Sequence, residues 1–221
     1  MENFDGIFSL FIACVEIVLI INLLIFSEKN FVNKIFILTI FVLFLYQFWE
    51  FLICFAGLDN SIFIYAAITT ITFLPPLVLF SVLNLYEFKS KANLLIFIPA
   101  LFFTGYYFIY MNQLEATKCA VMYAAYYYPL GDLYGVFYYL PVLISIIIII
   151  KKIRSPLDKT KKEQSVILLT GFLLTFVPST ILYFVYPNYT EIVESVLCKF
   201  AFILALTFFY FVLKNKTSIP K

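Results

Sequence analysis

Seven long apolar stretches dominate the sequence and leave little chain between them. They cover about residues 7–26, 33–57, 62–85, 93–111, 132–150, 165–186 and 191–213. A helix needs roughly 20 apolar residues to cross the hydrocarbon core of a bilayer. Backbone groups inside a bilayer must bond to one another, so apolar runs of this length form helices there. The sequence therefore predicts an all-α polytopic membrane protein, a bundle of seven transmembrane helices.

Composition narrows the classes of function. The chain is 64% hydrophobic and 13% charged, whereas charged residues make up about a quarter of a soluble domain. The spans use up almost all of the 221 residues, which predicts a single transmembrane domain, 1–221, and no soluble catalytic or nucleic-acid-binding domain. There is no histidine, and the four cysteines show no CxxC spacing. We therefore expect a protein that is not an enzyme and has no metal site or cofactor.

The distribution of basic residues predicts the orientation in the membrane. Acidic Glu2 and Asp5 precede the first stretch, so it is a span and not a signal peptide. Thirteen of the fifteen basic residues lie in connections 27–34, 86–92 and 151–164 and in the tail 214–221. The alternate connections hold only Lys118. Because cytoplasmic loops are rich in Lys and Arg, the N-terminus is expected outside and the C-terminus inside.

Two connections are long enough for a role of their own. The outer one, 112–131, reads NQLEATKCAVMYAAYYYPLG, and its three consecutive tyrosines are typical of an aromatic belt and of a short interfacial helix. The inner one, KKIRSPLDKTKKEQ, is strongly basic. It could bind anionic lipid or a cytoplasmic partner, or its charges could serve only to set the topology.

Three ionisable residues lie deep inside predicted spans. These are Glu16 in the first, Glu50 in the second and Lys199 in the seventh. At 1.5 Å per residue they lie roughly 14, 10 and 12 Å below the outer surface. Isolated charges at such depth either pair or become neutral. We therefore expect Lys199 to meet one of the two acids, preferably Glu50, and the other acid to be protonated.

The surroundings of Glu50 form a candidate site. Tyr46, Gln47, Glu50 and Cys54 fall on one helical face, and Trp49 lies beside them. The group is open to three interpretations: a structural salt bridge between helices, a ligand pocket open to the outside, or a proton or ion pathway. Cys54 and Cys119 both fall toward the outer side, where they could form a disulfide or remain buried free thiols.

The order and spacing of several motifs resemble a known family. The run FLYQFWEFLICFAGLDNSIFIYAAITTITFLPPLVLFSVLNLYE resembles the second and third spans of a sensor region at the N-terminus of some bacterial histidine kinases and diguanylate cyclases. That region has seven helices. The runs GDLYGVFYYLPVLISIIIIIKK and KKEQSVILLTGFLL resemble its fifth and sixth spans. Trp49, Glu50, Pro75 and Pro76 match positions of the family pattern.

The resemblance implies a receptor-like signalling module in a bacterial cytoplasmic membrane. In that family the last helix leads into an output domain, whereas here only KNKTSIPK follows it. The implied module would therefore stand alone and signal to a separate partner in the membrane or cytoplasm. Two other classes stay open: a structural or assembly subunit of a membrane complex, and a small transporter. A transporter usually carries inverted repeats, and the sequence has no clear internal symmetry.

Overall fold

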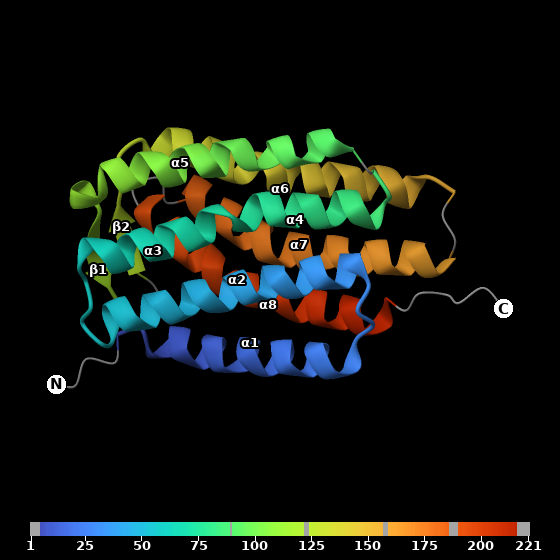
Figure 1. The fold of residues 1–221 in the computed structure, drawn as a ribbon, viewed down its shortest axis with the longest axis horizontal. Coiled ribbons are helices and arrows are strands. Elements are labelled where there is room, and N and C mark those ends of the chain that lie inside the picture. The colour runs from blue at the N-terminus through green and yellow to red at the C-terminus, as the bar shows by residue number, and fades with distance from the viewer. Residues whose placement is uncertain (1–4, 89, 122–123, 157–158, 186–189, 216–221) are drawn as a thin grey trace.

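The computed structural model describes residues 5–88, 90–121, 124–156, 159–185 and 190–215. Long helices lie side by side, successive spans run in opposite directions, and a small hairpin closes one end (Figure 1). The elements are α1 Ile7–Phe26, α2 Phe31–Cys54, α3 Ser61–Thr72, α4 Leu74–Leu85, η1 Lys91–Phe97, α5 Ile98–Ile109, η2 Met111–Gln113, β1 Glu115–Cys119, β2 Ala124–Tyr127, α6 Gly131–Arg154, α7 Lys159–Val185 and α8 Thr190–Lys214.

Six helical segments within the described residues are long and apolar enough to cross a membrane. They are Ile7–Phe26, Phe31–Cys54, Ser61–Leu85, Lys91–Ile109, Gly131–Arg154 and Lys159–Ile181. Large apolar side chains cover the outside of the bundle, with Phe26 70% and Ile109 76% exposed. Such a surface suits lipid and not water. The prediction of an all-α, multi-pass membrane protein is therefore confirmed, and α8 is a further long helix in the same bundle.

Asparagines fix where two helices begin. The Asn30 side chain accepts a hydrogen bond from the Asn33 backbone N–H at 2.8 Å, at the start of α2. Asn60 accepts from the backbone N–H groups of Ile62 and Phe63, both at 3.2 Å, at the start of α3. These caps satisfy N–H groups that have no partner within the helix. Both helices consequently start one or two residues earlier than their apolar stretches suggest.

The third predicted span is two helices in line. Phe73 separates α3 from α4, and Pro75 and Pro76 occupy the first turn of α4. Proline has no N–H to donate to a preceding turn but fits the first turn of a new helix. Pro141 and Pro178, by contrast, lie inside α6 and α7 without ending them. The adjacent pair therefore breaks its span, whereas the single prolines do not.

The loops rich in lysine gather at one end of the bundle, which we call the basic end. It holds the α1–α2, α4–η1 and α6–α7 connections and the end of α8 (right in Figure 1). Most basic residues there lie on helices, because α6 continues to Arg154 and α7 begins at Lys159, six residues before the predicted span at 165. The opposite end, which carries β1 and β2, is the hairpin end.

The hairpin corrects the prediction of an interfacial helix in 112–131. Strand β1 pairs antiparallel with β2, matching Glu115 to Tyr127 and Cys119 to Ala124. Ala124, Ala125 and Tyr126 are all buried, and β2 packs against α8. Tyr126 therefore lies inside the bundle and not in an aromatic belt, whereas Tyr127 is half exposed. The helix prediction was wrong because packing against the bundle, not local alanine content, decides the backbone here.

Close helix packing positions α8 in the bundle. A Cβ placed on Gly171 of α7 would lie 2.5 Å from Thr207 Oγ1 of α8. Small residues let membrane helices approach to this degree. The inward face of α8 carries Leu197, Ala201, Leu204, Ala205 and Phe208. This packing fixes the depth and rotation of Lys199, two residues after Leu197.

Candidate functional site

One face of α2 delivers polar groups into an otherwise apolar interior. Its buried stripe runs Phe36, Ile40, Leu43, Gln47 and Glu50 at spacings of three and four residues. Residues at this spacing share one face of a helix. The apolar residues of the stripe pack in the core. Gln47 and Glu50 are its polar residues and lie nearest the hairpin end.

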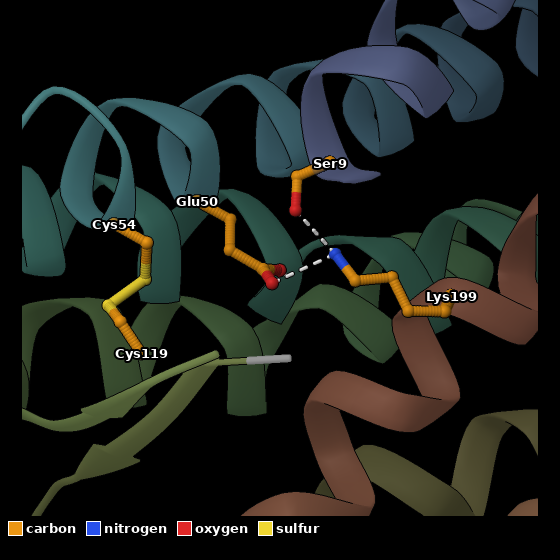
Figure 2. The surroundings of a disulfide bond; sticks show 5 residues. All are labelled: Ser9, Glu50, Cys54, Cys119 and Lys199. Atoms are coloured by element: carbon orange, nitrogen blue, oxygen red, sulfur yellow. Dashed lines mark hydrogen bonds and ion pairs between the residues drawn. A yellow bond between two sulfur atoms is a disulfide. The ribbon is translucent and has the colours of Figure 1, made fainter. Parts of the chain in front are cut away.

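Lys199 of α8 meets these residues and joins three helices. Its ammonium donates hydrogen bonds to Ser9 Oγ of α1 at 2.7 Å and to Gln47 Oε1 and Glu50 Oε1 of α2, both at 2.8 Å. An ammonium has three N–H donors, so all three are satisfied. Figure 2 shows Ser9 and Glu50 converging on the Lys199 nitrogen. We call Ser9, Gln47, Glu50 and Lys199 the lysine cluster.

The lysine cluster is closed to solvent. Ser9 and Gln47 are fully buried, and the side chains of Glu50 and Lys199 are 1% and 7% exposed. Moving two charges out of water costs several kcal/mol for each ion, which good geometry offsets. Removing one partner leaves the other charge stranded, at a cost of about 3–5 kcal/mol. The cluster therefore holds α1, α2 and α8 together only while both charges are present.

Glu16 lies apart from the cluster, which corrects the expected common depth of the three ionisable residues. It is fully buried on the same face of α1 as Ser9, seven residues further along. At 1.5 Å per residue that is about 10 Å deeper. Neither carboxyl oxygen of Glu16 has a hydrogen-bond partner within the described part of the chain. The predicted depths were misleading because α2 ends at Cys54 and not at 57, which brings Glu50 nearer the hairpin end.

The other two predicted site residues on α2, Tyr46 and Trp49, pack against neighbouring side chains. Tyr46 is buried in the core. Trp49 is partly buried, and its ring lies 6.0 Å from that of Phe63 on α3. Ser9 was not among the site residues predicted from the sequence. It lies seven residues before Glu16, about two helical turns, so a search for polar residues on the face of α1 that carries Glu16 would have found it.

A disulfide lies one helical turn beyond Glu50. Cys54, at the end of α2, bonds to Cys119, at the end of β1, with their Cα atoms 5.5 Å apart (Figure 2). Gly6, which precedes α1, donates its N–H to Ala120 C=O at 3.1 Å. A Cβ on Gly6 would lie 3.0 Å from Cys54 Cβ, and its φ of 76° favours glycine. The hairpin is thus fastened to both α1 and α2.

Within the described residues, no group of three or more Cys, Asp and Glu side chains is arranged to hold a metal ion. The described site offers a buried ammonium and its acceptors, with a second buried carboxyl, that of Glu16, on the same face of α1 as Ser9. In comparisons with known proteins, no family model, curated protein or solved structure matches the chain.

Proposed function

We propose that this chain is a receptor-like sensor of a bacterial cytoplasmic membrane. In this proposal it crosses the membrane seven times, with the N-terminus outside and the C-terminus inside. A stimulus acts on the hairpin end, and a separate partner reads the result at the basic end. The resemblance to sensor regions of kinases and cyclases supports this class of function.

Two independent features support the orientation. The basic end carries most of the lysines, and cytoplasmic loops are rich in basic residues. The hairpin end carries the Cys54–Cys119 disulfide, and disulfides persist in oxidising compartments outside the cytoplasm. Both features favour a hairpin end that faces outward.

The observation that carries the proposal is how the hairpin is attached to the bundle. It is bonded to α2 through Cys54, held to α1 through Gly6 and packed on α8 through β2. The lysine cluster joins those same three helices close by. Movement of the hairpin would therefore act on all three helices at once. The exposed side chains of Glu115, Lys118 and Tyr127 offer the surface on which a stimulus can act.

The same helices are linked again at the basic end. Asn215, just after α8, donates from Nδ2 to Asn33 Oδ1 of α2 at 2.8 Å. Asn33 in turn donates to Glu28 C=O, in the α1–α2 connection, at 2.9 Å. A displacement of α8 against α1 and α2 would therefore change this contact on the inner side, where a partner could detect it.

A structural or assembly role is the second candidate, and one observation favours it. The lysine cluster is closed and all three ammonium donors are satisfied, as expected of a bridge that only fixes helix positions. In the sensor proposal the cluster is accordingly a coupling element and not a ligand pocket.

Spin labels at the two ends would separate the two candidates. In a Cys14→Ser, Cys198→Ser background, one label pair at Lys34→Cys and Lys162→Cys reports the distance between α2 and α7 at the basic end. A separate label at Lys118→Cys reports hairpin mobility. Cys54→Ser with Cys119→Ser removes the covalent link between the hairpin and α2 without a reductant, which would also release disulfide-linked labels. The sensor proposal expects a changed α2–α7 distance distribution in lipid with helix content retained.

A control pair at Lys159→Cys and Val166→Cys, both on α7, keeps its distance because the helix fixes it. If the label on the hairpin becomes mobile while the α2–α7 distances stay the same, the hairpin does not communicate with the basic end. That result would overturn the sensor proposal and favour the structural one.

A further inference from the structure

Among the described side chains, the bundle interior holds one more carboxyl than the lysine cluster uses. Glu16 is fully buried, and both of its oxygens are without a hydrogen-bond partner in the described residues. A buried carboxylate is tolerated when it is paired or hydrogen-bonded, and otherwise it becomes neutral. The contacts of the lysine cluster therefore do not explain why Glu16 is buried in the interior.

A count of charges indicates what Glu16 binds. The helices packed on α1 are α2 and α8, and the described ionisable side chains on their buried faces near the hairpin end are Glu50, Tyr46 and Lys199. If both carboxyls were ionised, one ammonium would leave the interior with an uncompensated negative charge. One proton removes that charge without any additional residue.

Lys199 pairs with Glu50 and lies on α8, which packs against the helix that carries Glu16. Figure 2 shows its side chain extending from α8 toward the end of the bundle that holds the disulfide. There its nitrogen contacts Ser9 and Glu50. Glu16 lies on the same face of α1 as Ser9, two turns away in the opposite direction. A rotation about the flexible lysine side chain, without movement of the helices, would turn the ammonium away from Glu50 and toward Glu16.

We propose that Glu16 is a proton-binding site, and that its proton determines which carboxyl pairs with Lys199. With Glu16 protonated, Lys199 pairs with Glu50, as in this structure. When Glu16 releases its proton to water, its carboxylate competes with Glu50 for the ammonium. The ligand is thus a proton, and the site does not depend on the sensor role.

Infrared spectroscopy of the full chain in lipid tests both parts. At neutral pH, the wild-type protein is expected to show a C=O band of a protonated carboxylic acid, and Glu16→Gln is expected to remove it. Exposed acids are ionised at this pH, so the matched variant Glu163→Gln, at an exposed acid of α7, leaves the band unchanged. A wild-type spectrum without the band would overturn the proton site.

Glu50→Gln tests the exchange of partners. Lys199 then lacks its carboxylate, so Glu16 is expected to give up its proton and pair with it, and the band disappears although Glu16 is intact. Glu50→Asp, which keeps the charge but shortens the side chain, serves if the first variant fails to fold. It is expected to lower the pH at which the band disappears. A band that persists at neutral pH in Glu50→Gln, or titrates unchanged in Glu50→Asp, contradicts the exchange.

Discussion

The hairpin end and the basic end of the bundle are both cross-linked, but by interactions of different kinds. At the hairpin end a disulfide and a buried ion pair connect elements that are far apart in sequence. At the basic end the described links include neutral hydrogen bonds such as Asn215–Asn33, the exposed pair Lys161–Glu87 at 3.6 Å, and Lys152 over the ring of Phe88. Exposed pairs contribute little to stability, about 0–1 kcal/mol.

The two kinds of link respond differently to substitution. A buried charge that loses its partner keeps the full cost of its removal from water. A hydrogen bond lost near the surface is replaced in part by water. Single substitutions should therefore have larger effects at the hairpin end than at the basic end, although each end connects several helices.

Removing the buried ammonium is expected to have the largest effect. Lys199→Met strands Glu50 and should lower the free energy of unfolding in detergent by about 3–5 kcal/mol. The double variant Lys199→Met, Glu50→Gln should recover part of this loss, because neither charge then remains alone. Strictly additive losses in chemical denaturation would show that the two residues do not act as a pair.

Loss of the disulfide is expected to rank second. The bond closes a loop with a sequence separation of 65, and removing such a link costs about 2–4 kcal/mol. Cys54→Ser with Cys119→Ser should lower stability by that amount, with no added effect of reductant. Alkylation of the unreduced wild-type protein should label neither cysteine, and full labelling of both would show that the bond is not formed in the purified protein.

Two glycines with positive φ provide a matched test within the hairpin end. Gly6→Ala places a methyl group 3.0 Å from Cys54 Cβ, whereas Gly57→Ala meets nothing within 4 Å. Both share the backbone penalty of about 1 kcal/mol, and Gly6→Ala adds steric strain of about 1 kcal/mol or more. Equal losses for the two variants would mean that the contact between α1 and the end of α2 is looser than described.

At the basic end a smaller effect is expected from Asn215→Ala. It removes the hydrogen bond to Asn33 Oδ1 and should cost about 1 kcal/mol. Asn84→Ala, whose amide bonds only to the carbonyl of Phe80 in its own helix among the contacts described, is the control for a link between helices. A loss for Asn215→Ala as large as that of Lys199→Met would break the proposed difference between the two ends.

The smallest effect concerns Tyr86, which lies just after α4 and donates a hydrogen bond to Ser165 Oγ of α7 at 2.7 Å. Burial raises the pKa of the Tyr86 phenol above its ordinary value of 10.0, and the bond to Ser165 acts in the opposite direction. The folded state thus keeps this proton at a pH where the unfolded chain releases it. The stabilisation from the Tyr86 phenol is therefore fully present below the pKa of the unfolded chain. It is lost as the pH rises through the higher pKa of the folded state.

Tyr86→Phe has no phenol to titrate and should flatten the dependence of stability on pH in the alkaline range, measured by denaturation at a series of pH values. Tyr127→Phe, at an exposed tyrosine of β2, serves as the control. An unchanged alkaline slope in Tyr86→Phe would assign the dependence to other groups.

The amino-acid sequence was enough to predict the helices and the class of protein. Long apolar runs leave no alternative to helices in a bilayer, and predicted boundaries lie within a few residues of those found, apart from the start of α7. The sequence also indicated that Lys199 and Glu50 should meet, and the structure places them 2.8 Å apart. The cost of an isolated charge in hydrocarbon made that inference possible without any knowledge of packing.

Tertiary structure decided the hairpin, the third acceptor of Lys199 and the isolation of Glu16. Strand β2 contains AAYY, which has no alternation of polar and apolar residues and is extended because it pairs with β1 and packs against α8. Ser9 meets Lys199 across 190 residues of sequence, and this contact depends on the rotation and depth of α1 and α8. The rotation and depth of the helices are set by close contacts such as Gly171 against Thr207, which local sequence patterns do not encode.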